Sequence, residues 1–173
     1  MDNQSNRSAW KGLVAGAAGG VVASWAMDRF QYWWLSFGGA DELKLQQTQS
    51  DEGNHEEPAT VKTASAVSEG VFGHRLTVKE KEIAGPIVHY AVGTTGGAAY
   101  GIAAEYESGV TALAGIPFGA AFWLVVDEGA LPVLGLAKGP TAYPISNHAY
   151  ALASHLVFGL TAEIVRRTVR RVL

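Results

Sequence analysis

The chain has 173 residues, of which 48% are hydrophobic and only 17% are charged, and its formal net charge is -3. This length fits one domain over residues 1–173, and the charged fraction lies well below the roughly 25% of soluble domains. The negative net charge argues against a nucleic-acid partner, and the absence of cysteine excludes disulfides, thiolate metal sites and a cysteine nucleophile.

Charged residues are concentrated in one segment of the chain. Residues 38–82 hold nine acidic and five basic residues, whereas long stretches elsewhere hold almost none. A membrane-spanning helix needs about 20 mostly apolar residues, and four segments meet or approach that length. They are residues 10–37, 83–104, 110–131 and 146–165. We therefore predict an all-α integral membrane four-helix bundle in which residues 38–82 form a long polar outer loop.

Two features of this prediction leave alternatives open. Four core helices of a soluble bundle would give a similar pattern, but soluble helices carry a polar face. Residues 83–104 offer only histidine, tyrosine and threonine as polar side chains. Within the outer loop, Val61, Ala64, Val67 and Val71 share one helical face. That segment forms either a short helix on the membrane surface or on the bundle, or an exposed loop.

The orientation follows from basic residues near the ends of the chain. Arg7 and Lys11 precede the first segment, and four arginines follow the last one, at positions 166, 167, 170 and 171. Four spans place both termini on one side, so we expect both termini in the cytoplasm. We interpret the first apolar segment as a retained helix and not as a cleaved signal peptide, because the region before it is long.

Two segments carry glycine at every fourth position. The first has Gly12, Gly16 and Gly20, followed at the same spacing by Ser24 and Asp28, and the second has Gly93, Gly97 and Gly101. In lipid, helices associate through close packing, so small residues mark the faces that touch. We predict that both glycine faces pack against other helices, although glycine is common in membrane helices generally.

The antiparallel order of four spans predicts a polar cluster in the outer third of the membrane. Acidic residues come late in the two outward segments, and histidines come early in the two inward ones. Arg29 lies about 100° around the helix from Asp28 and can extend to the outer interface. The cluster consists of Asp28, Arg29, His89, Asp127, Glu128, His148 and His155.

Ionisable groups within a membrane are costly and point to function. One interpretation is a site that handles protons or small solutes, because histidine titrates near neutral pH. A second is a divalent metal site, and a third is a haem between His89 and a histidine of the last segment. The structural alternative is a hydrogen-bonded group that only orients the helices. No hydrolase motif is visible, and we expect no enzymatic activity and no bound metal or cofactor.

The tail "HLVFGLTAEIVRRTVRR" closes the last segment. It resembles the C-terminus of YagU-like proteins, a family of small bacterial inner-membrane proteins of unknown molecular function. His155, Glu163, Arg166 and Arg167 match that pattern, whereas the loop over residues 38–82 differs from it. Independently of the resemblance, Glu163 has the helical spacing to pair with Arg166 or Arg167. The resemblance implies a helical protein of the bacterial inner membrane and supplies no catalytic residues.

We therefore expect a small non-catalytic inner-membrane protein whose polar cluster handles protons or small solutes. One alternative is a structural or accessory subunit of a larger membrane complex, with glycine faces that dock a partner helix. Another is a redox subunit that binds metal or haem. The expected partners are the lipid bilayer and further copies of the chain or other membrane subunits.

Overall fold

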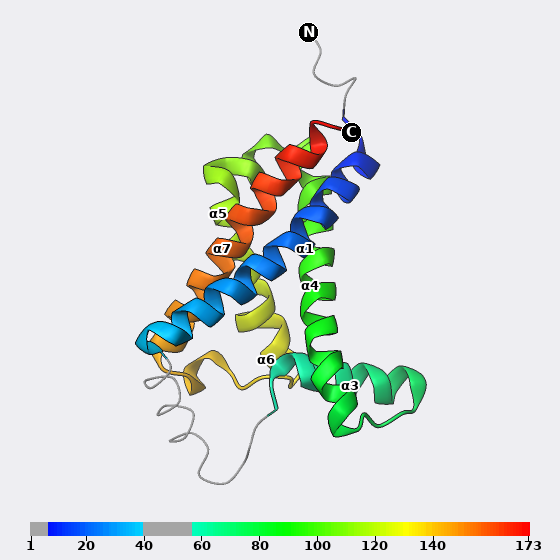
Figure 1. Ribbon diagram of the computed structural model, residues 1–173, viewed down its shortest axis with the longest axis vertical. Helices are drawn as coiled ribbons and strands as arrows, with labels where there is room; N and C mark the ends of the chain where they lie inside the picture. The colour runs from blue at the N-terminus through cyan, green and yellow to red at the C-terminus, as the bar shows by residue number, and fades with distance from the viewer. Residues whose placement is uncertain (1–6, 40–56) are drawn as a thin grey trace.

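The computed structural model describes residues 7–39 and 57–173, and throughout these ranges the protein is helical, without a β-strand. Three long helices, α1 (Ala9–Trp34), α4 (Val78–Tyr106) and α7 (Ile145–Arg170), pack with a fourth segment centred on α5 (Ile116–Val125). The start of α1 and the C-terminus lie at one end of this bundle, which we call the terminal end, and α3 (Ala59–Phe72) lies across the other end (Figure 1). The prediction of an all-helical bundle is confirmed.

Capping explains why α4 and α7 extend beyond the predicted segments. The Thr77 hydroxyl accepts a hydrogen bond from Glu80 N, and the Glu80 carboxylate accepts one from Thr77 N, so α4 begins five residues before position 83. Helix α7 follows Pro144 and ends on a turn that carries Arg167 and Arg170, which favour the negative end of the helix dipole. The predicted outer loop contains α3, and its residues 40–56 lie outside the described residues.

The third predicted span is not one continuous α-helix. Residues Ser108–Gly115 form tight 3-10 turns, and Leu113, Ala114 and Gly115 have left-handed backbone angles with φ of 46°, 54° and 83°. Pro117 stands in the first turn of α5, where its missing N–H costs no hydrogen bond, so it begins a helix here and does not kink one. A π-helical turn, Val126–Ala130, joins α5 to the short helix α6 (Leu131–Val133).

This third segment is also the clearest candidate for a membrane span. Among the described residues, only Ser108–Val133 is both long enough and apolar enough to meet the requirements for crossing a bilayer. Just 11% of its most apolar window is buried inside the protein, so it is not the enclosed core helix of a soluble domain.

Glycine sets the distance between α1 and α4. A methyl group at Gly12, Gly16 or Gly20 would lie less than 3.0 Å from backbone atoms of α4, which is closer than real side-chain carbons approach. The opposing positions on α4 are Gly101, Gly97 and Gly93, and Gly93 also faces the Ser24 hydroxyl. The two helices therefore run antiparallel in backbone contact along their glycine faces.

Further small residues bring α7 against its other neighbours. Gly19 of α1 faces the Ala162 backbone, and Gly119 of α5 faces the backbone at His155 and Gly159. The space between α4 and α5 is filled instead by aromatic rings, with Tyr100 stacked on Phe118 at 4.1 Å between centroids. The interior thus combines close glycine contacts with one aromatic layer.

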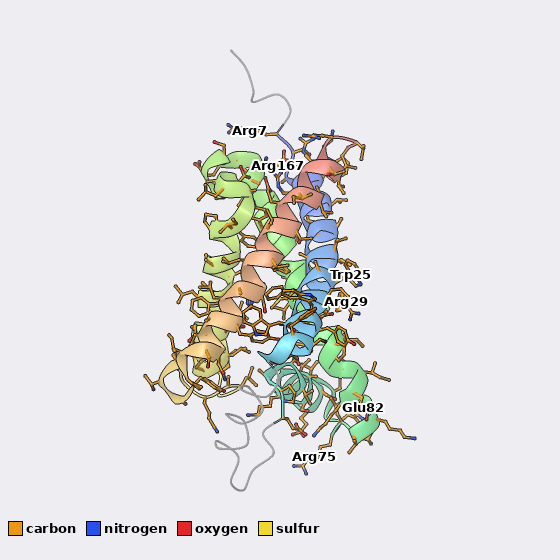
Figure 2. The ribbon with its side chains drawn as sticks, turned by 60° about the vertical axis from the view of Figure 1, so that its left-hand side comes forward. Arg7, Trp25, Arg29, Arg75, Glu82 and Arg167 are labelled. Carbon is orange, nitrogen blue, oxygen red and sulfur yellow. The ribbon has the colours of Figure 1, made fainter. Side chains whose placement is uncertain are left out.

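The outer surface carries the large apolar side chains. On α1, Leu13, Val21 and Trp25 are exposed, and on the α5 segment Leu124 and Val125 are exposed at 58% and 65%. Trp25 points away from the bundle, as does its neighbour Arg29 (Figure 2). Small residues inside and large apolar residues outside are the reverse of the arrangement in a soluble bundle.

Candidate functional site

A cavity of about 820 Å³ is lined by residues from the end of the bundle where α3 lies. Helices α1, α4 and α7 line it together with the π-helical turn after α5, and α3 contributes Thr60 and Thr63. Most of the lining is apolar. Its acidic and histidine side chains come from three separate segments and are His89, Asp127, Glu128, His148 and His155.

The first histidine–carboxylate pair joins α1 to α4. Asp28 lies four residues beyond Ser24 on the face of α1 that contacts α4, so its carboxylate meets that helix at His89 and Tyr90. His89 Nε2 lies 3.2 Å from Asp28 Oδ1, and the Tyr90 hydroxyl donates to Asp28 Oδ2 at 3.0 Å. The Nε2 atom is buried and makes no hydrogen bond of good geometry.

The second pair joins the π-helical turn to α7. His148 Nδ1 lies 2.6 Å from Glu128 Oε1, and His148 Nε2 lies 2.9 Å from the Pro140 carbonyl oxygen. A carbonyl can only accept, so Nε2 carries a hydrogen and donates it. The contact between Nδ1 and the carboxylate then requires one further proton, held either by the imidazole or by Glu128. This geometry therefore stores a proton between the two side chains.

The third pair lies deeper in the cavity. His155 is buried, and its Nδ1 donates to the Ala151 carbonyl at 2.9 Å and lies 3.8 Å from Asp127 Oδ2. The hydrogen bond to the backbone carbonyl places a hydrogen on Nδ1. Asp127 and Glu128 both project from the π-helical turn, a local widening of the helix that is frequent at functional sites.

The structure thus brings six of the seven predicted cluster residues into three pairs. Arg29 is the exception, because its side chain is exposed on the outer face of α1, where the guanidinium lies 5.8 Å from the Tyr32 ring centroid. The predicted cluster included Arg29 as a residue about 100° around the helix from Asp28 whose side chain can extend to the outer interface. The rotation of about 100° per residue turns neighbours on a helix to different faces, and this one faces outward.

A second polar network lies towards the other end, around Glu163. Its carboxylate is fully buried and accepts from the Tyr100 hydroxyl at 2.9 Å and from Arg166 Nε at 2.6 Å. Arg167 also donates to it. The pairing with both arginines agrees with their helical spacing, whereas Tyr100 comes from another helix. The position of Tyr100 beside the α4 glycine face was the only signal in the sequence for its contact with Glu163.

A third network ties three helix ends together beside the termini. Arg170 Nε donates to Glu105 Oε1 at 2.6 Å, and Ser8 N donates to Glu105 Oε2 at 3.0 Å. The hydrogen bonds from Arg170 are the main cause that lowers the pKa of Glu105 below its usual range. The same carboxylate raises the pKa of Arg170. Glu105 therefore stays ionised and holds the ends of α1, α4 and α7 in place.

In the described part of the chain, no group of three or more histidine, aspartate or glutamate side chains is arranged to hold a metal ion. The family described as "Protein of unknown function (DUF1440)" matches residues 55–164, which is more than half of the chain. The chain belongs to the DUF1440 family. It matches no curated protein and no solved structure.

Membership in DUF1440 agrees with the expectation of a family without an assigned function, and the resemblance to YagU-like proteins stays a prediction. The family match includes His89, Asp127, Glu128, His148 and His155. Asp28 precedes it. Two complete histidine–carboxylate pairs and the histidine of the third thus lie within the DUF1440 segment.

Proposed function

We propose that this DUF1440 protein crosses the bacterial inner membrane four times and takes up and releases protons at its outer cavity, with or without a small solute. The observation that carries this proposal is that four segments contribute three histidine–carboxylate pairs, and that five of the six paired side chains line one cavity of about 820 Å³. The role that we assign to these pairs is proton exchange without catalysis.

The distribution of side chains supports insertion into lipid. Exposed tryptophan, leucine and valine side chains around the bundle would be a liability in water but match acyl chains. Helices α1, α4 and α7 have 26, 29 and 26 residues, enough to cross a hydrocarbon core of roughly 30 Å. Their mean hydropathy is moderate because their inner faces carry glycine and polar groups, while their outer faces remain apolar.

The charge distribution supports the orientation. Arg7 and Arg167 lie at the terminal end, and Arg75 and Glu82 lie at the opposite end (Figure 2). The terminal end also carries Arg170 and Arg171 without the acidic excess of the outer loop. Under the positive-inside rule the termini face the cytoplasm, and the cavity opens towards the outer side.

A comparison with Glu163 distinguishes the cavity pairs from a structural network. Glu163 is fully buried and accepts from two arginines and a tyrosine, so its charge is permanently neutralised. Asp28, Glu128 and Asp127 are instead each paired with a histidine, and histidine as a side-chain type can change its charge between pH 5 and 8. Removing a proton from such a pair changes the net charge that faces the cavity, which is the property a proton-handling site requires.

The alternatives lack comparable support. Docking of a partner through the glycine faces would need those faces to be accessible, but Gly12, Gly16 and Gly20 contact α4 within the chain. A metal or haem subunit would need several ligands directed at one point, whereas the described histidines each pair with a different carboxylate.

The test is proton flux into liposomes that contain the purified protein and an enclosed pH-sensitive dye. When the external medium is acidified, the lumen of liposomes with wild-type protein should acidify at least tenfold faster than that of empty liposomes. The double variants Asp28→Asn/His89→Gln and Glu128→Gln/His148→Gln should each remove most of that difference. Arg29→Gln is the matched control, because it changes an adjacent exposed charge on the same helix. Size-exclusion chromatography checks that every variant still assembles. Wild-type liposomes that acidify no faster than empty ones would overturn the proposal.

A further inference from the structure

A second cavity, of about 640 Å³, lies beside the termini and is lined mainly by polar atoms. It is formed where the start of α1 meets the ends of α4 and α7. Its charged lining consists of Arg7, Lys11, Glu105, Arg170 and Arg171. We refer to this cavity as the basic cleft.

We propose that the basic cleft binds the phosphate of an anionic phospholipid headgroup in the leaflet that faces the termini. This inference rests on the proposed insertion into the membrane but is independent of proton handling at the outer cavity. A lipid headgroup and a free phosphate ion would both present a negatively charged phosphate to the cleft. We assign the ligand to the lipid.

The charges of the cleft leave cations available to such a ligand. Glu105 is engaged by Arg170 and by Ser8 N, so this acid and one arginine neutralise each other. Lys11 Nζ donates to the Leu173 oxygen at 2.6 Å. Neither Arg7 nor Arg171 has a carboxylate partner among the described residues. Two guanidinium groups, each able to bind a phosphate through two parallel hydrogen bonds, thus line a cavity with an excess of positive charge.

The surroundings of the cleft favour a lipid over a soluble anion. Next to Lys11, the side chains of Trp10, Leu13 and Val14 are exposed on the outer face of α1. The Lys11 ammonium lies 5.9 Å from the Trp10 ring centroid, an arrangement suited to the membrane–water interface, where tryptophan gathers. A phospholipid can place its phosphate in the cleft while its acyl chains extend along this apolar face. Basic pockets between helices on the cytoplasmic side bind headgroups in this way.

The test titrates the full-length protein, in neutral detergent, with dihexanoyl phosphatidylglycerol and separately with dihexanoyl phosphatidylcholine and inorganic phosphate, by calorimetry. We expect phosphatidylglycerol to bind at least tenfold more tightly than either of the others. Each arginine near an anionic headgroup is worth roughly fivefold in affinity, so Arg7→Gln/Arg171→Gln should weaken phosphatidylglycerol binding about 25-fold. Arg7→Lys/Arg171→Lys keeps the charge and should retain most of the binding.

The control is Arg75→Gln/Lys79→Gln, which removes the same charge from exposed positions at the opposite end and should leave the affinity unchanged. Equal affinity for the two lipids, or no loss in the Arg7 and Arg171 double variant, would overturn the proposal. Inorganic phosphate binding as tightly as phosphatidylglycerol would assign the cleft to a soluble anion and refute the lipid source. Flotation of the protein with vesicles in the absence of detergent tests membrane insertion separately, so the two failures are distinguishable.

Discussion

The glycine contact between α1 and α4 makes a quantitative prediction for Gly16→Ala. The added carbon would lie 2.8 Å from Gly101 Cα and closer still to the Gly97 carbonyl oxygen. Both neighbours are backbone atoms that cannot rotate away, so the two helices must separate. Overpacking of this kind costs about 1–3 kcal/mol, and we take the upper end because backbone opposes backbone. Alanine has a higher helix propensity than glycine and stabilises the helix by about 1 kcal/mol, so the net loss in the free energy of unfolding is about 2 kcal/mol.

Gly70→Ala is the matched control for this change. Gly70 lies in α3, and a methyl group there would have no heavy atom within 4 Å. The same substitution should therefore stabilise the protein by about 1 kcal/mol through helix propensity alone. The predicted gap between the two variants is about 3 kcal/mol, the difference between these two net effects.

The assay is unfolding in mixed micelles of increasing denaturing detergent, followed by circular dichroism, with wild type and both variants at the same protein concentration. Gly16→Ala should shift the midpoint down and Gly70→Ala should shift it up. Equal shifts for the two variants would refute the argument that backbone contact sets the distance between α1 and α4.

Three further predictions use the same unfolding measurement. Glu163→Gln leaves the buried Arg166 without its counter-charge and should cost about 3–5 kcal/mol, and a loss below 1 kcal/mol would contradict the role given to this network. Glu105→Gln should destabilise the protein at neutral pH. Because the folded-state pKa of Glu105 is lowered, the stability difference from wild type should persist above pH 4.5 and shrink as the pH falls through the folded-state pKa. A stability difference that does not change with pH would contradict this. Ala114→Gly relieves a left-handed alanine and should stabilise by about 1 kcal/mol, whereas Ala103→Gly within α4 should destabilise by about as much; the same sign for both would refute the strain argument.

The sequence by itself determined the helical character of the protein and the end of the bundle at which its ionisable groups lie. Apolar segments separated by turns and by one polar stretch predict helices, because hydrophobic run length and helix signals are local properties of the chain. The alternating direction of successive helices then places Asp28, His89, Asp127 and His148 at one end. This follows from their positions along the segments and requires no knowledge of the packing.

Tertiary structure decided which of the ionisable side chains contact one another. The choice of Tyr100 as a partner for Glu163 depends on how each helix is rotated about its axis. So does the division of the cluster into three pairs. Rotation is set by contacts between glycine faces of different helices. These contacts depend on the atoms of both partners, which the periodicity of a single segment does not contain.

The interruption of the third segment has the same origin. Composition over residues 110–131 predicts a continuous helix, because every residue there except Gly and Pro tolerates one in an apolar setting. The left-handed turn at Leu113–Gly115 instead lets Gly115 approach Gly159 of α7, a contact that exists only once both helices are in place. Local preference thus predicted where helices form, while contact between distant backbones decided where this one begins.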